Sequence, residues 1–385
     1  MLFSGNVSAG QINEIKDIFQ LKVVSKHEKY LGLPSMVGRK KVSFFKEIKL
    51  RILSKISGWQ SKFFLSGGRE VLIKAVAQAV SAYAMNVFRL PTTLCDDMQR
   101  AVAGFWWGVK KDRKSIHWTK WESLCHTKGR GGLGFRDFAC FNQALIAKQS
   151  WRIIQNPRSL LTKILQARYF KNCEFLQAKL GSKPSFIWRS ILWGRQIIQK
   201  GMRWRIGSGD SVKVYKSQWI PRPQTFKPIA PATLSVEATV AGLIDANHQW
   251  KETLIHQHFS KEDAEKILQI QLPISPQPDQ ILWHYDKKGQ YSVKSGYQIA
   301  RKIKHSEESS CSENSSGQWN VIWAMELPEK IKIFMWRAVK NLLPTAENLW
   351  KRRVMQDPIC SRCKMKAESM SMHYGNANQQ GRCGS

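Results

Sequence analysis

The sequence lacks the features of a membrane or secreted protein. No stretch among its 385 residues approaches about 18 apolar residues without a charge, so we expect no membrane span. The first residues, MLFSGNVSAGQINEIK, lack the basic flank and apolar core of a signal peptide. The eight cysteines are sparse and unevenly spaced, so we expect free thiols in a reducing intracellular compartment, nuclear or cytoplasmic.

Acidic residues are also few. The chain has 28 Asp and Glu against 61 Lys and Arg, a net charge of +33, and residues 101–200 carry 19 basic and 4 acidic side chains. Because 43% of the residues are apolar, the composition is globular and not disordered. A cationic block in a globular chain indicates a polyanionic partner: nucleic acid, an anionic membrane surface or an acidic protein. We expect nucleic acid and no membrane partner, because consecutive amphipathic helices would bury one another's apolar faces.

The sequence contains no recognisable catalytic motif. The glycines of KGRGGLGFRD (128–137) lack the Gly-Lys-Ser/Thr of a phosphate-binding loop, so we predict a tight turn between helices. The pair Asp96–Asp97 follows Pro91, where a helix begins, whereas a polymerase pair lies on a hairpin between apolar strands. We therefore predict that these aspartates cap the helix, and that the chain has no catalytic residue and no catalytic magnesium site.

Apolar periodicity predicts a mainly α fold. Apolar residues recur every three or four positions in several segments, and Ser8 with Gln11 has the spacing of a capping box. The predicted helices cover residues 9–20, 42–57, 69–88, 93–107, 138–154 and 157–170, and a small helical unit covers 319–350.

Two segments alternate in the manner of strands. Residues 203–220 turn at a Gly-Ser-Gly-Asp sequence and residues 281–293 turn at Lys-Lys-Gly, so each is predicted to form a small β hairpin. Four prolines in residues 220–233 predict a linker. The Ser- and Glu-rich residues 304–318 are predicted to be disordered.

Tryptophan and basic residues interleave in WQSKFF, FWWGVKKDRKSIHWTKW, WRSILWGR and MRWRIGSG. We expect most of these tryptophans to pack in the core and the surrounding cations to contact a nucleic-acid backbone. The candidate nucleic-acid-binding residues are Lys46, Lys49, Lys55, Lys110, Lys111, Arg113, Lys114, Lys128, Arg130, Arg203 and Arg205.

The segments KYLGLP, LSGGREVLIKAVAQAV, FWWG, GGLGFRDFACFNQALIAKQSWR, GMRWRIGSGDSVKVY and IWAMELPEKIKIFMWRAVKNLLPT, in this order, resemble plant LINE-type (non-LTR) retrotransposon reverse transcriptases. The resemblance covers nearly the whole chain and corresponds to the region after the polymerase palm. It implies a primer-grip remnant with thumb-like helices (1–110), a basic helical connection with a hairpin (111–220), a linker with a small α/β segment (221–303), a disordered linker (304–318) and a small C-terminal helical zinc-binding domain (319–385).

The family's catalytic aspartates lie in a Tyr/Phe-Ala-Asp-Asp hairpin, and this sequence does not contain that motif or a ribonuclease H domain. The resemblance therefore implies a non-catalytic part of an RNA-directed DNA polymerase that grips RNA, DNA or hybrid duplex without sequence specificity. Three alternatives remain open. The chain could assist a separate palm-containing polypeptide, act as a protein-interaction module that exposes its Trp-rich helices, or be a retroelement fragment without a function.

The C-terminal tail has the residues of a zinc site. In the family this domain ends with a Cys-x-x-Cys pair, a His and a last Cys, which places the metal ligands at Cys360, Cys363, His373 and Cys383. Nine residues separate Cys363 from His373, and nine more separate His373 from Cys383, a longer last gap than the family's pattern. Because a tetrahedral zinc site tolerates variable loops, the resemblance leaves two alternatives, a zinc site closed by Cys383 and a degenerate one.

Overall fold

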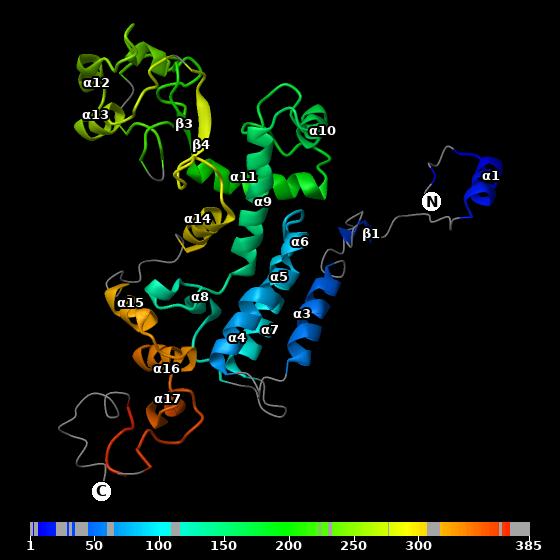
Figure 1. Ribbon diagram of the computed structural model, residues 1–385, viewed down its shortest axis with the longest axis vertical. Coiled ribbons are helices and arrows are strands. Elements are labelled where there is room, and N and C mark those ends of the chain that lie inside the picture. The colour runs from blue at the N-terminus through cyan, green and yellow to red at the C-terminus, as the bar shows by residue number, and fades with distance from the viewer. Residues whose placement is uncertain are drawn as a thin grey trace.

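A computed structural model gives a mainly helical chain, as the sequence predicts (Figure 1). It describes residues 3, 7–20, 29–30, 33–34, 45–59, 65–108, 116–222, 225–229, 233–275, 277–305, 316–361 and 364–369. Within these ranges the strands form two antiparallel sheets of two strands each. No helix in the described ranges is long and apolar enough to cross a membrane.

The N-terminal helix stands apart from the other helices (Figure 1). Helix α1 (Ala9–Phe19) begins with the predicted capping box, in which the Ser8 side chain accepts a hydrogen bond from the Gln11 amide. None of its residues is buried. A short sheet follows, in which β1 (Lys29–Tyr30) pairs antiparallel with β2 (Leu33–Pro34).

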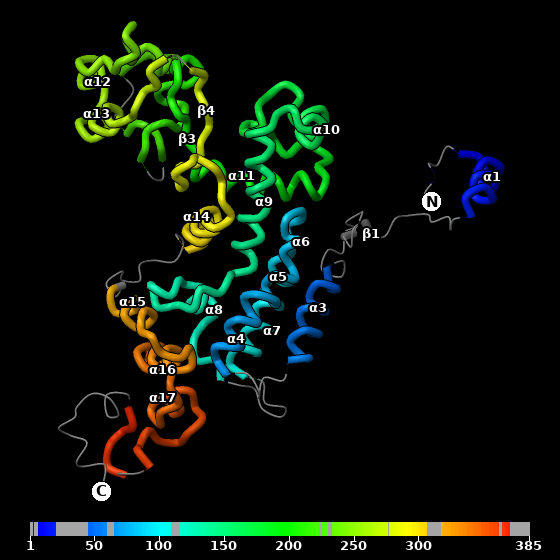
Figure 2. Tube along the Cα trace, in the orientation of Figure 1, coloured from blue at the N-terminus to red at the C-terminus, as the bar shows by residue number. Residues whose placement is uncertain are grey.

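The central layer is built by helices that apolar periodicity predicts. The predicted helix 69–88 is interrupted by a π-helical turn, η1 (Ile73–Ala77), whose Ile73 side chain is fully buried. Figure 2 shows this interrupted helix beside its two neighbours. The elements of the layer are α3 (Lys46–Gly58), α4 (Ser66–Leu72), α5 (Gln78–Val80), α6 (Ala82–Met85) and α7 (Thr92–Trp107).

The long helix α9 packs closely against α11. The two helices can approach this closely because Gly194 of α11 has no side chain: an added Cβ atom would lie 2.7 Å from the Ala147 amide nitrogen of α9. Apolar periodicity did not predict α11, although Ser185 caps it by accepting a hydrogen bond from the Trp188 amide. The elements are α8 (Trp121–Leu124), the 3-10 turn η2 (Lys128–Arg130), α9 (Phe138–Gln155), α10 (Leu160–Tyr169) and α11 (Phe186–Gly201).

The second sheet corrects the prediction of two β hairpins. Strand β3 (Met202–Arg205) pairs antiparallel with β4 (Gln280–Trp283), so the strands of the two predicted hairpin segments, 203–220 and 281–293, pair with each other. The first segment turns back without forming a second strand: the Trp204 amide donates to the Gln218 carbonyl, and Asp279 accepts hydrogen bonds from three amides at the tip. In the second segment the Trp283 amide donates to the Gly289 carbonyl, and a helix follows.

The described part of the predicted linker, residues 220–222, 225–229 and 233, contains a buried side chain. Phe226 is fully buried, and its carbonyl accepts hydrogen bonds from the amides of Trp219 and Ile220, so this part of the segment packs against its neighbours. The helices that follow it are η3 (Val240–Leu243), α12 (Glu252–His258) and α13 (Lys261–Leu268).

Four helices lie among the described residues from Val293 to Lys351. Residues 304–305 and 316–318, at the two ends of the segment predicted to be disordered, are helical, and residues 306–315 lie outside the described residues. At the first end, Lys304 Nζ lies 2.7 Å from Asp137 Oδ2, which joins α14 to the start of α9. The four helices are α14 (Val293–His305), which packs on α9, α15 (Ser316–Ala324), α16 (Glu329–Val339) and α17 (Ala346–Lys351).

Candidate nucleic-acid interface and metal site

Helix α3 carries three of the predicted phosphate-binding cations, and one of them already has a carboxylate partner. Lys46 and Lys55 are exposed, and neither forms an ion pair within the part of the chain that the structure describes. Lys49 Nζ lies 2.6 Å from Asp97 Oδ2, and this hydrogen bond lowers the pKa of the Asp97 carboxyl. Lys46 and Lys55 are therefore the cations of α3 that remain available to a phosphate.

The aspartate pair on α7 does not cap the helix, so that prediction is wrong. The helix begins at Thr92 with Pro91 as its N-cap, and its first turn contains no acidic residue. Asp96 and Asp97 lie in the second turn, where the backbone amides already bond within the helix. Asp97 is instead bound by Lys49 of α3 and by Arg100 one turn further along.

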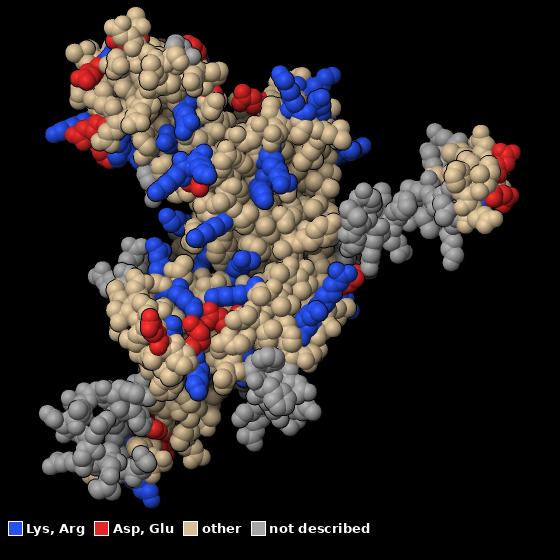
Figure 3. Space-filling view, in the orientation of Figure 1, with Lys and Arg blue, Asp and Glu red and all other residues tan. Residues whose placement is uncertain are grey.

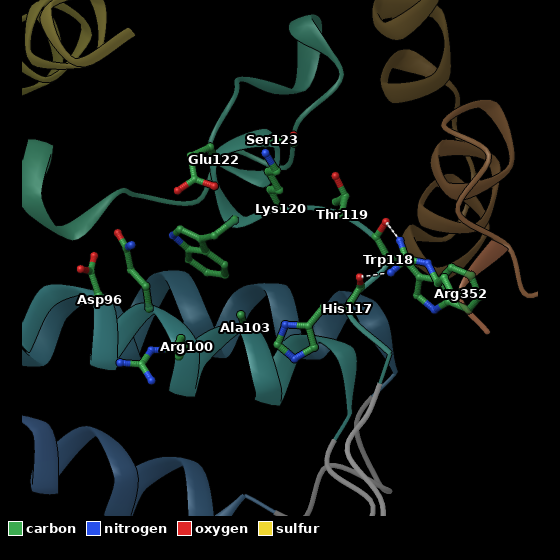
Figure 4. Close-up of a pocket in the computed structure, with 12 residues that line it drawn as sticks. Asp96, Arg100, Ala103, His117, Trp118, Thr119, Lys120, Glu122, Ser123 and Arg352 are labelled. Atoms are coloured by element: carbon green, nitrogen blue, oxygen red, sulfur yellow. Dashed lines mark hydrogen bonds between the residues drawn. The ribbon is translucent and has the colours of Figure 1, made fainter. Parts of the chain in front are cut away.

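An open groove of about 770 Å³ lies between α7, residues 117–123 and Arg352, next to α17 (Figure 4). The Arg352 guanidinium donates to the His117 and Trp118 carbonyl oxygens at 2.8 and 2.6 Å, and it lies 5.1 Å from the Trp118 ring centroid. The charged side chains that line the groove are Asp96, Arg100, Lys120, Glu122 and Arg352. Because both signs of charge line it, the groove is not suited to a polyanion. Arg352 serves there to hold the end of α17 to the residues just before α8.

The glycine turn at 128–134 forms a docking site for the C-terminal helices. Lys128 Nζ lies 3.2 Å from Glu70 Oε1 and 3.6 Å from Glu329 Oε2, and it stacks 4.2 Å from the Trp323 ring centroid. Lys128 thus joins α4 to α16. Arg130, at the end of the same 3-10 turn, is exposed and has no ion-pair partner among the described residues.

The tryptophans of this region pack as the sequence predicts. Trp336 Nε1 donates to the Gly131 carbonyl at 3.0 Å, and Lys340 Nζ lies 4.9 Å from the Trp319 ring centroid. All 16 tryptophans lie within the described residues, and Trp350, at 46% exposure, is the one that is exposed. The interleaving of basic and aromatic residues therefore reflects intramolecular cation–π packing at this joint.

The remaining predicted cations lie on β3 or outside the described residues. Arg203 is partly buried, burial lowers its pKa, and its Nε donates to His284 Nδ1 at 3.3 Å. Arg205 is exposed. Lys110, Lys111, Arg113 and Lys114 lie outside the described residues.

The predicted interface omits the most cationic part of the chain. Residues 151–200 carry ten basic side chains and one acid, Glu174. Most of these cations are exposed on and around α10 and α11, and none of them forms an ion pair with a described residue. The local charge count could have predicted these cations from the sequence, because a segment with ten basic residues and one acid leaves most of them without a nearby carboxylate partner.

Cys360 lies in a tight backbone reversal that suits a zinc ligand. Ile359 and Ala367 form an antiparallel bridge, the Cys360 amide donates to the Lys366 carbonyl and the Lys364 amide donates to the Cys360 carbonyl, both at 2.8 Å. Lys364 has a positive φ of 51°, which the reversal requires. Cys360 is 5% exposed, and a cysteine thiolate is one of the usual ligands of a structural zinc site.

The other three predicted zinc ligands, Cys363, His373 and Cys383, lie outside the described residues. Within the described ranges no group of three or more His, Cys, Asp or Glu side chains could hold a metal ion. The reversal is joined to α17 by Glu368, whose Oε2 accepts from the Ala346 amide at 3.1 Å. A ligand at Cys360 would therefore be fixed to the body of the protein.

Comparison with known proteins identifies the same region. Residues 291–376 match the family described as zinc-binding in reverse transcriptase. The chain is 27% identical over 350 residues to an Arabidopsis thaliana protein named "Putative ribonuclease H protein", and the match covers 88% of this chain and 55% of the relative. It is 41% identical over 152 residues to an "Uncharacterized mitochondrial protein" of the same plant, covering 39% of this chain and 99% of the relative.

A mainly helical chain with a reverse-transcriptase zinc-binding region and these plant relatives is retrotransposon-derived. It belongs to the family of plant LINE-type (non-LTR) retrotransposon reverse transcriptases. The chain spans just over half the length of the first of these relatives. The matched region contains Cys360, Cys363 and His373 and ends before Cys383.

Proposed function

We propose that this chain binds RNA–DNA hybrid and other nucleic-acid duplexes through their phosphate backbone, without sequence preference and without polymerase activity of its own. The observation that carries the proposal is the excess of cations. If all 28 carboxylates were paired, 33 of the 61 Lys and Arg would remain without a partner. Such an excess binds polyanions through counterion release, which does not depend on base sequence.

Four exposed cations support a backbone contact at the positions predicted from the sequence. They are Lys46 and Lys55 on α3, Arg130 on the glycine turn and Arg205 on β3. Lys49 and Lys128 contribute less to this contact, because each would have to give up a carboxylate at 2.6 or 3.2 Å to bind a phosphate.

We propose that the chain has no polymerase activity because its adjacent aspartates are not available to bind metal ions. The sequence contains no Tyr/Phe-Ala-Asp-Asp motif, and Asp97 of its adjacent pair is already bound by Lys49 and Arg100. Two-metal nucleotidyl transfer needs carboxylates that are free to hold both ions. Polymerisation would therefore need a palm that these 385 residues do not supply, and the chain would assist that palm by holding the duplex.

The test measures affinity for a hybrid of about 20 base pairs between about 50 and 200 mM salt. The wild-type chain should lose affinity steeply as salt rises. The variant Lys46→Gln/Lys55→Gln/Arg130→Gln/Arg205→Gln should bind more weakly, with a slope of log K against log salt that is shallower by about 0.9 for each lost phosphate contact.

A matched control removes four exposed cations from other elements. The substitutions Lys261→Gln/Lys287→Gln/Lys288→Gln/Lys302→Gln remove the same charge from α13, the turn after β4 and α14. This variant should keep more of the affinity and of the slope than the first one. A wild-type affinity that does not change with salt would contradict the proposal, and so would nucleotide incorporation by the isolated chain in a primer-extension assay.

We also propose that the C-terminal tail holds a structural zinc ion through Cys360, Cys363, His373 and Cys383. The buried Cys360 in its closed reversal supports this, and bound zinc would cross-link the tail to the α17 region. Metal analysis should find about one zinc per chain. Cys360→Ser should remove it, and Cys383→Ser should weaken binding if Cys383 is the fourth ligand. Equally low zinc in all three proteins would show that the site is degenerate.

A further inference from the structure

Helix α10 exposes an apolar stripe that no described element covers. The helix is anchored through one face, on which Thr162 and Leu165 are buried. The neighbouring face carries Leu160, Leu161 and Ile164, with exposures of 75%, 42% and 57%. Ile164 lies four positions after Leu160 and three after Leu161, so it contacts both and the three side chains form one continuous stripe.

Basic side chains surround this stripe. Arg158, Lys163, Arg168 and Lys171 are exposed on α10 or immediately beside it, and none forms an ion pair within the described ranges. Figure 3 shows Lys and Arg gathered at the end of the molecule where α10 lies. An apolar centre with a charged rim is the usual construction of a protein–protein interface.

The surface is less suited to nucleic acid than to protein. Tyr169, the aromatic residue of α10, stacks on Trp188 with a centroid distance of 4.7 Å, and Trp188 is fully buried. No ring on this helix is therefore free to stack on a base. A phosphate backbone would contact the cations but would leave the three aliphatic side chains without an apolar partner.

Two further occupants also fit the surface poorly. A second copy of the chain would bring the same cations together, and like charges across an interface oppose association. A membrane surface would have to be held by three aliphatic side chains on a helix whose other face is buried, whereas interfacial helices insert a whole apolar face.

We propose that α10 binds an acidic amphipathic helix of a partner protein. Leu160, Leu161 and Ile164 would pack against the apolar face of that helix, and Arg158, Lys163, Arg168 and Lys171 would meet its carboxylates. In this binding mode an amphipathic helix packs on an apolar surface through side chains that recur every three or four positions. It is separate from duplex binding through α3, the glycine turn and β3.

The test uses a synthetic peptide of about four helical turns, with leucine at every third or fourth position and glutamate elsewhere. A scrambled peptide of the same composition keeps the charge and loses the apolar face. The full-length chain is compared with an apolar variant, Leu160→Ser/Leu161→Ser/Ile164→Ser, and a charge variant, Arg158→Gln/Lys163→Gln/Arg168→Gln/Lys171→Gln. Because all these side chains are exposed, both variants should keep the wild-type circular dichroism and melting temperature.

The wild-type chain should bind the ordered peptide, and the apolar variant should bind it at least about tenfold more weakly. The charge variant should bind more weakly and with less dependence on salt. The affinity of the apolar variant for the RNA–DNA hybrid should equal that of the wild-type chain, so duplex binding and peptide binding can fail separately.

Four results would overturn the proposal. The ordered peptide could fail to bind, the scrambled peptide could bind equally well, or the apolar variant could bind the ordered peptide as tightly as wild type. The fourth is a loss of affinity of the apolar variant for the hybrid, or for vesicles of anionic phospholipid, that matches its loss for the peptide. That result would assign the stripe to nucleic acid or to a membrane surface.

Discussion

The glycine turn that receives the C-terminal helices should tolerate no side chain at Gly132. A Cβ atom at this position would lie 2.1 Å from the His126 carbonyl oxygen, a separation that non-bonded carbon and oxygen atoms do not adopt. The obstacle is backbone, so it cannot be relieved by a side-chain rotation. The Gly132 amide donates to the Thr127 carbonyl at 3.0 Å, and Gly134 donates to His126 at 2.8 Å, so any shift of the turn weakens both bonds.

The cost of Gly132→Ala follows from these contacts. Overpacking a closed site costs about 1–3 kcal/mol, and each weakened backbone hydrogen bond adds about 1 kcal/mol. We therefore expect a loss of about 3 kcal/mol in the free energy of unfolding. The disturbance would also reach α16, because Trp336 donates to the carbonyl oxygen of the neighbouring Gly131.

Two other glycines distinguish the steric clash at Gly132 from the effects of backbone conformation. Gly134 has a φ of 71°, but an added Cβ atom would meet only Lys74 Nζ at 3.7 Å, so Gly134→Ala should cost only the backbone strain, about 1 kcal/mol. Gly104 lies inside α7 with nothing within 4 Å of an added Cβ atom. Gly104→Ala should therefore stabilise the protein by about 0.5–1 kcal/mol.

Urea unfolding followed by tryptophan fluorescence and circular dichroism measures all three variants against wild type. The expected order of midpoints is Gly104→Ala, wild type, Gly134→Ala and, lowest, Gly132→Ala. Equal midpoints for Gly132→Ala and Gly134→Ala would refute the reasoning, because they would mean that the close approach to the His126 carbonyl has no energetic consequence.

Two further predictions concern the turn bound by Asp279 and a histidine. The Asp279 carboxylate accepts three backbone amide bonds at 2.7–3.0 Å from the tip of the 207–211 turn, so Asp279→Asn should cost about 1–3 kcal/mol in urea unfolding, whereas Asp210→Asn, an exposed change in the same turn, should cost nothing measurable. His126 is exposed at the surface, yet desolvation of its partly buried ring, and next the positive Arg301, lowers its pKa to about 4 from an ordinary value of 6.5. The unfolded chain therefore binds the extra proton first, and stability that is present above pH 6.5 is lost as the pH falls toward 4. His126→Gln should show a smaller fall in melting temperature between about pH 7 and pH 5 than wild type, and an identical fall would contradict this assignment.

The helices could be predicted from the sequence because their signals are local. The capping box at Ser8 forms as its spacing predicts, and the apolar repeats of α3, α7 and α9 point into the cores that those repeats require. The π turn at Ile73–Ala77 could not be predicted in this way. It changes the register by one residue within an apolar run, which leaves the local pattern looking helical.

The pairing of the strands could not be predicted from local sequence patterns. Alternation correctly placed extended backbone at Met202–Arg205 and Gln280–Trp283, but it suggested a local partner for each strand. The true partners lie more than 70 positions apart in the sequence, and the turn that seemed to close the first hairpin is bound instead by Asp279. Alternation reports which face of a strand is buried, and it contains no information about a distant partner.

The sequence also could not show which cations are free of a carboxylate partner and available to bind phosphate. Lys46 and Lys49 lie on the same helix, yet Lys49 pairs with Asp97, which is 48 residues away. Lys128 looked like a phosphate contact beside glycines, and it pairs with Glu70 and Glu329. Composition predicts how many cations must remain unpaired, and the fold decides which ones they are.

The same distinction determines how salt should act on this protein. Exposed cations such as Lys46 and Arg205 interact with phosphates through solvent, where about 0.15 M salt screens charges beyond about 8 Å. Lys128 lies between a buried Glu70 and the Trp323 ring, and such partly buried contacts are screened much less. Salt should therefore release the nucleic acid before it loosens the joint between α4 and α16. A loss of duplex binding at moderate salt with an unchanged melting temperature would be the signature of backbone contact by an intact fold.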